Sequence, residues 1–464
     1  MTAPDLLIVG GGAAGLSAAA TARAIDLSVE LLDERPALGG NFFAGIGERT
    51  DGDGAFGPDY ARGRSLLAAA GAAKLSKATL AWRIERDGRA FALGEEGPVR
   101  SIGPKRLLVA TGAMERPIPI PGAILPGVMY AGAAQLMLKT ASSVPSGRCV
   151  LVGSGPLLLL LAKQLLDFGV VPSALVETTP RVGFAAALQG LPAALNAPDL
   201  LRKGLALQRA IKRARVPWHR HATGVSLLGR ERVEQVAFTD ANGHNQSIHT
   251  ELALLHDGII PNDHVTRQLG CRESWNAAQH CFSPVTDQWG ETSLPGIFAA
   301  GDCTGIWGAQ AAELAGEIAA LEIGRQLGRI DAQERDRRAR EPLLKLKRQR
   351  AFRPFLEQRF PPLISRAEQA AADAVICRCE NVTAGEIRSA VAQGATGPDQ
   401  LKSFTRSGMG PCQGRSCAMA VAEIMAKEIG CSVQAVGRHD IRPPLKPLPL
   451  GKVGAAQVEL ETVA

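Results

Sequence analysis

A glycine fingerprint near the N-terminus constrains the fold of this chain more than any other feature. The apolar run Leu6–Val9 leads directly into Gly10-x-Gly12-x-x-Gly15, and small and apolar residues suited to a buried helix follow. Gly10 permits a tight turn, Gly12 lets a pyrophosphate approach the backbone, and Gly15 lets helix and strand pack closely. Asp33 ends the next strand, where it can accept hydrogen bonds from a ribose. The sequence therefore predicts an α/β domain that binds a dinucleotide at a helix N-terminus.

A second strand–glycine–helix unit begins about 140 residues later. It reads Gly153-Ser-Gly155-Pro-Leu-Leu158, so a leucine stands where the fingerprint has its third glycine. Because the glycine roles are steric, Leu158 predicts a retained fold with an impaired or altered nicotinamide site, either empty or holding another nucleotide. Glu177 at the end of the next strand is either a ribose ligand or a charged strand end. Two such units indicate two nucleotide-binding-type domains, one inserted in the other.

Four cysteines near the C-terminus have the spacing of a metal site. Cys377-x-Cys379 and Cys412-x4-Cys417 are separated by 32 residues. This spacing suits Zn²⁺ or a [2Fe–2S] cluster. A glycine-rich loop around Cys412 and the apolar-periodic run 418–429 favour the anionic cluster, because backbone N–H groups and a helix N-terminus can face its sulfurs. We expect these four thiolates to ligate one [2Fe–2S] centre, with structural zinc as the alternative.

Composition and charge narrow the class of protein. The 464 residues suffice for roughly three domains, and the 46% hydrophobic and 21% charged content is that of a soluble globular protein. Of the net charge of +7, the segment from Arg329 to Arg359 carries +6, so binding of nucleic acid is not expected. The basic segment is either a solvated linker or a docking surface for an acidic partner or an anionic membrane.

The total number of cysteines indicates a reducing compartment. Nine cysteines are an odd number and too few for a disulfide scaffold. The sequence shows no secretory signal, and no apolar run approaches the ~20 residues that span a bilayer. We therefore expect a cytoplasmic location. Peripheral association with the inner face of the membrane is the alternative. Residues 1–370 contain no C-x-x-C or C-x4-C pair, which argues against a disulfide reductase. We expect four cysteines of this region to be buried and isolated, namely Cys149, Cys271, Cys281 and Cys303.

Two further segments resemble the two-dinucleotide-binding-domain flavoproteins, the superfamily of thioredoxin-reductase-like and ferredoxin-reductase-like enzymes. They are Leu107-Leu-Val-Ala-Thr-Gly-Ala113 and Ala300-Gly301-Asp302. In that superfamily the first unit binds FAD, the Ala-Thr-Gly strand runs beside the adenosine and pyrophosphate, and the aspartate holds ribityl hydroxyls. The resemblance implies an α/β Rossmann-like FAD domain with an inserted second nucleotide-binding-like domain. It implies FAD contacts at Gly10, Gly12, Ala13, Ala14, Gly15, Asp33, Glu34, Arg35, Gly40, Asn41, Ala81, Thr111, Gly112, Gly301, Asp302 and Ala309.

The cysteine segment is similar to the bacterioferritin-associated-ferredoxin-like (BFD-like) [2Fe–2S] domain. The matching residues are Cys377-Arg-Cys-Glu-Asn381, Lys402, Arg406 and Gly408-Met-Gly-x-Cys-Gln-Gly-Arg-x-Cys417. The expected organisation is an FAD domain in two parts (1–122 and 251–328), a degenerate NAD(P)-binding-like domain (123–250), a basic linker (329–372), a BFD-like domain (373–430) and a Pro-rich tail (431–464).

The order of these domains resembles one family, the larger electron-transfer (A or alpha) subunits of bacterial heteromeric amine dehydrogenases. The family includes octopine and nopaline oxidase, D-hydroxyproline dehydrogenase, and hydrogen cyanide synthase, where the B subunit corresponds to this chain. The segments 255–262 and 302–309 and the Arg-Pro-Pro tail also match the family. One departure is Gly39-Gly-Asn-Phe-Phe43, where such chains more often have Gly-Gly-Gln followed by Ile-Tyr.

The family implies an FAD-dependent oxidoreductase that acts on CH–NH or CH–NH₂ donors as part of a complex. One partner, which resembles D-amino-acid oxidases, oxidises the amine (an opine, D-hydroxyproline or glycine), and a small ferredoxin-like subunit completes the complex. Electrons pass through flavin and [2Fe–2S] cluster to a quinone or other respiratory acceptor. This chain is then a relay without catalytic residues for C–H cleavage, and His256 beside Asp257 is expected to be structural. The alternatives are a stand-alone NAD(P)H-dependent reductase that feeds a ferredoxin-type partner, against which Leu158 argues, and a purely structural subunit.

Overall fold

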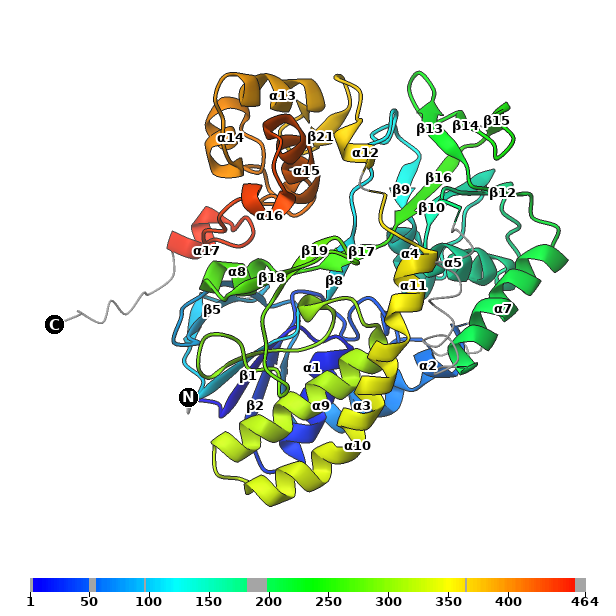
Figure 1. Cartoon of the computed structure of the whole chain (residues 1–464). Coiled ribbons are helices and arrows are strands. Elements are labelled where there is room, and N and C mark those ends of the chain that lie inside the picture. The colour runs from blue at the N-terminus through cyan, green and yellow to red at the C-terminus, as the bar shows by residue number, and fades with distance from the viewer. Residues whose placement is uncertain (1–2, 50–55, 96, 182–197, 364, 455–464) are drawn as a thin grey trace.

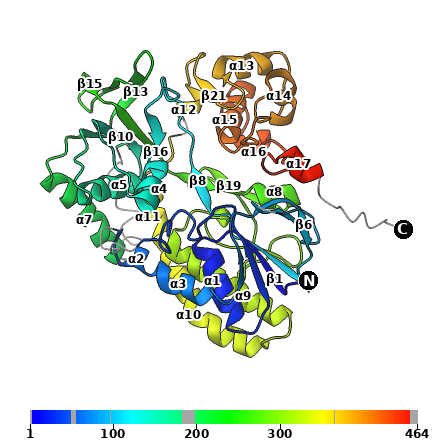
Figure 2. The ribbon, with the colours of Figure 1, turned by 180° about the vertical axis from the view of Figure 1, so that it is seen from behind.

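The computed structural model describes residues 3–49, 56–95, 97–181, 198–363 and 365–454. These residues form two α/β domains and a smaller, mainly helical domain that carries the four cysteines (Figure 1). We call them the first domain, the second domain and the cysteine domain. In both views of the molecule the cysteine domain stands over the first domain beside the second one (Figures 1 and 2).

The first domain is built on a five-stranded parallel sheet with the order β20-β7-β1-β2-β3. Its central strand β1 is a run of four buried apolar residues, and the inner strands on either side are mostly buried and apolar, so the sheet requires cover on both faces. The strands are β1 (Leu6–Val9), β2 (Val29–Leu32), β3 (Lys74–Ser76), β7 (Arg106–Val109) and β20 (Ile297–Ala299).

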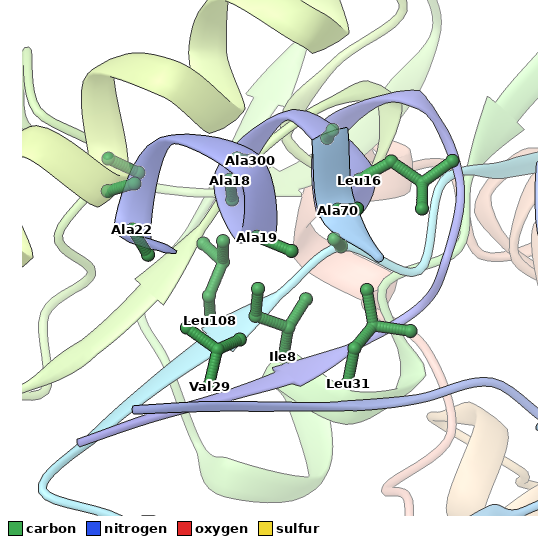
Figure 3. Packing of buried hydrophobic residues seen from close by; sticks show 14 of the residues in the cluster. Ile8, Leu16, Ala18, Ala19, Ala22, Val29, Leu31, Ala70, Leu108 and Ala300 are labelled. Atoms are coloured by element: carbon green, nitrogen blue, oxygen red, sulfur yellow. The ribbon is translucent and has the colours of Figure 1, made fainter. Parts of the chain in front are cut away.

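Two helices rich in small residues cover one face of this sheet. Figure 3 shows Leu16, Ala18 and Ala19 of α1 (Ala13–Arg23) packed over apolar side chains of the strands. Helix α9 (Ala309–Gln326) lies against α1 so closely that a Cβ at Gly316 would fall 2.1 Å from the Ala14 carbonyl oxygen. The other face is covered by the antiparallel sheet of β4 (Leu80–Ile84), β5 (Ala90–Leu93) and β6 (Arg100–Ile102). Short helices α2 (Pro58–Ala61) and α3 (Gly63–Ala70) flank α1.

The second domain repeats this plan with a parallel sheet of order β12-β11-β10-β16-β9. Three helices pack on one of its faces, and an antiparallel sheet covers the other. The helices are α4 (Ala131–Ala141), α5 (Pro156–Asp167) and α7 (Pro198–Arg213), and the strands are β9 (Val128–Tyr130), β10 (Cys149–Ser154), β11 (Ala174–Glu177), β12 (Trp218–Arg220), β13 (Thr223–Leu228), β14 (Gln235–Thr239), β15 (Asn245–His249) and β16 (Leu252–Asp257).

The expected end of the second domain at residue 250 is too early. Strand β16 is an inner strand of the second sheet, where it pairs with β10 on one side and β9 on the other. The second domain therefore extends to Asp257. The antiparallel pair β8 (Ala113–Glu115) and β17 (Ile259–Pro261) then returns the chain to the first domain. There it forms α8 (His264–Leu269), the hairpin β18 (Glu273–Asn276) and β19 (Cys281–Pro284), and the short 3₁₀ helix η2 (Asp302–Thr304).

The basic segment is folded, which corrects the expectation of a linker. Helix α10 (Ala332–Ala351) packs through Leu346 against α9, and α11 (Arg353–Arg359) continues to the second domain. There the Arg359 guanidinium lies 3.3 Å from the Glu177 carboxylate. Most cationic side chains of α10 face solvent, and a single apolar stripe packs the helix against α9. The basic composition of the segment therefore does not indicate that it forms a packed helix.

The cysteine domain consists of three helices and a small two-stranded sheet. Strands β21 (Val375–Cys377) and β22 (Val382–Thr383) precede α13 (Ala384–Ala392), which begins with a capping box between Thr383 and Glu386. Helices α14 (Pro398–Thr405) and α15 (Ala418–Ile429) complete the domain, and Gly430 ends α15 in the left-handed conformation with φ 77°. The short helix α12 (Ser365–Glu368) joins this domain to α11.

The C-terminal tail ties the cysteine domain to the first domain. The buried Arg438 guanidinium binds the carboxylates of Asp263 (2.6 Å) and Glu273 (2.7 Å). Farther along, Leu445 is buried in the first domain and its backbone N–H donates to the Trp82 carbonyl oxygen. The tail includes α16 (Val433–Val436) and α17 (Leu450–Gly454) and runs beside α8 in both views (Figures 1 and 2).

Candidate cofactor sites

The first glycine fingerprint forms an open cradle at the start of α1. Gly12 is the N-cap of this helix, and no side chain caps its first N–H groups. A Cβ at Gly15 would fall 1.9 Å from the Gly10 carbonyl oxygen, whereas a Cβ at Gly12 would meet nothing nearer than Gly40, at 3.8 Å. Gly15 is thus required for packing, and Gly12 borders free space. An uncapped helix N-terminus that faces free space suits a pyrophosphate.

Asp33 lies beside this cradle. Its Oδ2 accepts a hydrogen bond of 2.7 Å from the Gly11 N–H, and its Oδ1 accepts one of 2.8 Å from the Arg35 N–H. Burial raises the pKa of Asp33 above its ordinary value. The Arg35 guanidinium in turn donates to Asn41 Oδ1 at 2.6 Å, and Glu34 pairs with Lys446 of the tail. The structure therefore brings these predicted residues to one edge of the first sheet.

The second predicted FAD segment follows β7. The Thr111 hydroxyl donates to the Asn262 carbonyl oxygen at 2.6 Å, and the Asn262 N–H donates to the Gly112 carbonyl oxygen at 2.9 Å. Asn41 Nδ2 donates to the Ala113 carbonyl oxygen at 3.1 Å, which links this segment to the loop after Gly40. Ala81 lies in β4, where its side chain packs into the apolar cluster between the two sheets of the first domain.

The third predicted segment brings Asp302 to the start of α9. Asp302 Oδ1 accepts hydrogen bonds from the N–H groups of Trp307 (2.9 Å) and Gly308 (3.0 Å), and Gly308 is the N-cap of the helix that begins at Ala309. Burial raises the pKa of Asp302. A Cβ at Gly301 would fall 2.9 Å from Ala14 Cβ, so this loop lies against the start of α1. Segments almost 300 residues apart in the sequence thus converge on one cradle, and the cradle fits FAD.

The second glycine turn is covered by the chain itself. A Cβ at Gly153 would fall 1.7 Å from the His256 carbonyl oxygen, and a Cβ at Gly155 would fall 3.1 Å from His256 Nε2. The His256 ring is 2% exposed, and its Nδ1 lies 2.8 Å from Glu115 Oε1. The imidazole therefore fills space beside the turn where a dinucleotide-binding domain receives its pyrophosphate.

The other features of the second site also have protein partners. Glu177 Oε2 accepts a hydrogen bond of 2.9 Å from the Trp218 indole N–H, while Arg359 of α11 approaches Oε1. Leu158 is 1% exposed and packs between the second sheet and its helices. The neighbouring Asp257 carboxylate pairs with Arg366 at 2.7 Å. His256 is thus buried inside strand β16 and not after a strand, and its structural role stays a prediction.

The four predicted metal ligands are arranged as two pairs of thiols. A hydrogen bond with the Cys417 thiol is the main cause that lowers the pKa of Cys377 to about 5. Cys379 is hydrogen-bonded to Cys412, but its pKa is raised, chiefly by burial and also by this bond. Cys377 and Cys417 are buried, Cys412 is half-buried and Cys379 is exposed. In the described part of the chain, no three His, Cys, Asp or Glu side chains converge as one metal ion would require.

Four thiols in two pairs fit the ligand set of a [2Fe–2S] centre. In such a centre each of two irons takes two protein thiolates, whereas structural zinc takes four ligands around a single point. The loop between α14 and α15 supplies donors to the sulfurs. The Gly408 N–H is hydrogen-bonded to Cys377, and the Ser407 hydroxyl donates to Cys417 Sγ at 3.9 Å.

The other five cysteines, all of them in the described ranges, form no disulfide. Cys149, Cys271, Cys281 and Cys303 are buried and unpaired, and the remaining cysteine, Cys431, is exposed and unpaired. Burial raises the pKa of Cys303 to about 11, and the neighbouring Asp302 carboxylate acts in the same direction. Such thiols are poor nucleophiles at neutral pH.

The sequence did not point to two residues that join the cofactor sites, Gln279 and His280. Gln279 contacts the loop after Asp302, and His280 contacts Glu423 of the cysteine domain. Neither belongs to a recognisable motif, because their partners lie 27 and 143 residues away in the chain. Only the folded arrangement reveals them.

Comparisons with known proteins agree with this geometry. Residues 4–316 match the pyridine nucleotide-disulphide oxidoreductase family, and residues 375–427 match the BFD-like [2Fe-2S] binding domain. The chain is 39% identical to the A subunit of opine oxidase from Agrobacterium tumefaciens (strain Ach5), over 97% of this chain and 91% of that protein. It is 33% identical to HcnB, a subunit of hydrogen cyanide synthase from Pseudomonas aeruginosa, over 96% and 97% of the two chains.

Solved structures show the same fold. L-proline dehydrogenase from P. horikoshii superposes with a TM-score of 0.71 at 21% identity, over 97% of this chain and 79% of that one. Thioredoxin reductase from T. acidophilum superposes with a TM-score of 0.52 at 21% identity, over 70% of this chain and 98% of that one.

Fold, glycine cradle and thiol pairs together define a flavoprotein oxidoreductase that holds FAD in its first domain and a [2Fe–2S] cluster in its C-terminal cysteine domain. Within this class, the chain belongs to the family that includes HcnB of hydrogen cyanide synthase and the A subunit of opine oxidase. No helix in the described ranges combines the length and apolar character needed to cross a membrane.

Proposed function

We propose that this chain is the electron-transfer subunit of a heteromeric amine or amino-acid dehydrogenase. A partner subunit oxidises the substrate (an opine, D-hydroxyproline or glycine), and electrons leave through FAD and the [2Fe–2S] cluster for a quinone or other acceptor. One observation carries the proposal. The chain keeps two sites for redox cofactors, while His256 lies against the glycine turn at which a nicotinamide dinucleotide would bind its pyrophosphate.

The residues of the cradle have distinct tasks in this proposal. Gly10, Gly12 and Gly15 shape the turn, and the first N–H groups of α1 hold the pyrophosphate. Asp33 fixes the turn through Gly11 and lies where the adenosine ribose binds. The backbone of Glu34, Arg35, Ala81, Thr111 and Gly112 lines the adenosine, and Ala13, Ala14, Gly40 and Asn41 line the phosphates and the flavin.

Asp302 then holds the ribityl chain. Its Oδ1 is already fixed by two N–H groups, so Oδ2 is the atom that accepts from a ribityl hydroxyl. Gly301 and the N-terminus of α9 at Ala309 complete this side of the site. When bound, FAD accepts a pair of electrons and releases them singly, which matches a one-electron iron–sulfur centre.

The thiolates of Cys377, Cys379, Cys412 and Cys417 hold the cluster. Cys379 is the exposed ligand, so the cluster edge nearest to it is the natural exit for electrons toward another protein. The relatives are named as subunits, which supports a multi-subunit complex for this chain. We propose two partners, a D-amino-acid-oxidase-like FAD subunit together with a small ferredoxin-like subunit, in the cytoplasm or on the inner face of the membrane.

The experiment that tests this function compares two electron donors. The chain is purified anaerobically, alone and co-expressed with the two proposed partner subunits. We expect NADH to leave the flavin oxidised in both preparations. We expect one of the candidate amines to bleach the flavin of the complex and not of the isolated chain. Bleaching by NADH alone would favour the stand-alone reductase, and a chain without flavin absorbance would favour a structural subunit.

A further inference from the structure

A two-residue segment, Gln279-His280, touches the surroundings of both cofactor sites. On the flavin side, Gln279 Oε1 accepts a hydrogen bond of 2.9 Å from the Ile306 N–H, and Gln279 Nε2 donates to the Ile306 carbonyl oxygen at 3.1 Å. Ile306 belongs to the loop between Asp302 and α9, whose next two N–H groups bind the Asp302 carboxylate. Gln279 therefore holds the loop that carries the proposed ribityl ligand.

On the cluster side, His280 Nε2 lies 2.9 Å from Glu423 Oε1. Both side chains are buried, with 7% and 8% of their surfaces exposed. Glu423 lies on α15, the helix whose N-cap is the cluster ligand Cys417. On the same helix, Met419 packs against Ile260 and Cys281 of the first domain. The cysteine domain thus rests on the first domain through the helix that starts at its own ligand.

The backbone of this segment is fixed on both sides. Arg116 is buried, and it donates to the carbonyl oxygens of Gln279 (2.7 Å) and His280 (3.2 Å). The Trp275 ring meets the His280 ring edge-on at a centroid distance of 4.7 Å. His280 also has a φ of +46°, a conformation that a residue with a side chain adopts only when its surroundings hold it there. These contacts make the segment a rigid support and not a hinge.

We propose that Gln279-His280 is the junction that fixes the cysteine domain against the flavin loop, so that electrons cross between flavin and cluster inside this chain without a swing of the cysteine domain. His280 is a positioning residue in this account, and Glu423 is its partner. The inference rests on the proposed function, because it assigns the flavin to the Asp302 loop.

The electron balance follows from the two cofactors. Oxidation of the reduced flavin releases two electrons and two protons. The cluster is reduced by one electron at a time and passes each to an external acceptor, a quinone or a dye, while the protons go to solvent. Swinging the domain away would break the buried hydrogen bond between His280 and Glu423 and expose Met419 to water, and each change opposes separation.

The test uses the full chain with both cofactors and substitutions at the junction. His280→Ala and Glu423→Ala remove the interdomain hydrogen bond, and Glu423→Gln keeps a side chain that can bond to the ring. The matched control is Glu428→Ala, on the same helix, which removes only a half-exposed pair with Arg388. FAD and iron contents are measured first. The flavin is then reduced rapidly by light, and the rate of cluster reduction is measured. Hydrogen exchange of residues 275–283 and 418–424 is measured on the same proteins.

We expect both alanine variants to keep FAD and iron. Their cluster reduction should be slower by roughly tenfold, because the docked arrangement is less populated, and hydrogen exchange at the junction should rise. Glu423→Gln should recover most of the rate, and Glu428→Ala should match the parent chain. Should His280→Ala fail to fold, the two Glu423 variants carry the test alone. An unchanged rate in Glu423→Ala with both cofactors in place would overturn the inference. A parent chain that lacks FAD or the cluster would instead overturn the proposed function.

Discussion

The imidazole of His256 lies against Gly155, so that a Cβ on this glycine would fall 3.1 Å from His256 Nε2. Gly155 is the glycine that should let a pyrophosphate approach the second domain. The ring is held there by Glu115, while Trp218 and Arg359 engage the carboxylate of Glu177. The second domain therefore keeps the nucleotide-binding fold, and we propose that its own side chains take the place of the ligand.

The first prediction is that NADH does not reduce the bound flavin. Because His256 covers the turn and Leu158 replaces the third glycine, the second domain should not present a nicotinamide to the flavin. Anaerobic mixing with NADH, followed at the flavin absorbance band, measures this directly. Bleaching as fast as in an NADH-dependent reductase would show that the ring moves aside and that this account of the second domain is wrong.

Gly12→Val should abolish FAD binding without unfolding the chain. A Cβ at Gly12 meets no atom nearer than 3.8 Å, so the protein has room for the valine, which then occupies the space proposed for the pyrophosphate. Gly15→Val is the contrasting variant. Its Cβ would fall 1.9 Å from the Gly10 carbonyl oxygen, so it should disturb the fold itself. Flavin content and thermal unfolding separate the two effects, and a Gly12→Val variant with full flavin would refute the assignment.

Cys412→Ser should remove the cluster and leave FAD in place. The cysteine domain is small, and ligation supplies part of the folding energy of such domains, so local order should fall as well. Cys431→Ser is the matched control, since Cys431 is an exposed, unpaired cysteine outside the two thiol pairs. Iron and acid-labile sulfide are measured on anaerobically purified protein. Zinc in place of iron in the parent chain would contradict the cluster assignment and would give the cysteine domain a structural metal site.

His439 should make the protein less stable in mild acid. Burial lowers its pKa from 6.5 to about 4, and its ring packs against Gly408 and Gly414 beside the cluster loop. As the pH falls below 6.5, the unfolded chain binds a proton that the folded chain does not, so the free energy of unfolding decreases until about pH 4. The loss between pH 6.5 and 5 should be about 2 kcal/mol for this residue alone.

The check is chemical denaturation at several pH values in the parent chain and in His439→Leu. Leucine keeps an apolar volume between the two glycines and cannot titrate. Between pH 6.5 and 5, the free energy of unfolding of His439→Leu should therefore fall by about 2 kcal/mol less than that of the parent chain. Identical pH dependence in the two proteins would mean that His439 does not resist protonation in the folded state.

Local patterns predicted several elements correctly. Helix α15 runs from Ala418 to Ile429, over the apolar-periodic run named from the sequence, and ends before Gly430, because periodic apolar residues and a glycine stop are local signals. The sequence patterns failed where contacts are distant. From the sequence, residues 252–257 are expected to begin the second part of the FAD domain. Only their pairing with β10 shows that they belong to the second sheet.

Composition also misled the interpretation of the basic segment, since its few apolar positions, such as Leu346, are outnumbered by exposed charges. The cofactor classes were predictable because glycine turns and cysteine spacing are short motifs, and the family comparisons confirm FAD and a [2Fe–2S] cluster. Contacts that link or close the sites were not predictable. Pairs such as Glu115 with His256, or His280 with Glu423, join residues more than 140 positions apart.

The most direct test of the central claim is an anaerobic titration of the co-expressed complex with its amine substrate, followed at the flavin band and by the paramagnetic signal of the reduced cluster. The account predicts that the amine reduces the flavin and the cluster of this chain in the complex. The amine should reduce neither centre in the isolated chain. NADH should reduce neither centre in the complex or in the isolated chain. Reduction of the isolated chain by amine, or of either preparation by NADH, would contradict the role of this chain as an electron relay for a partner subunit.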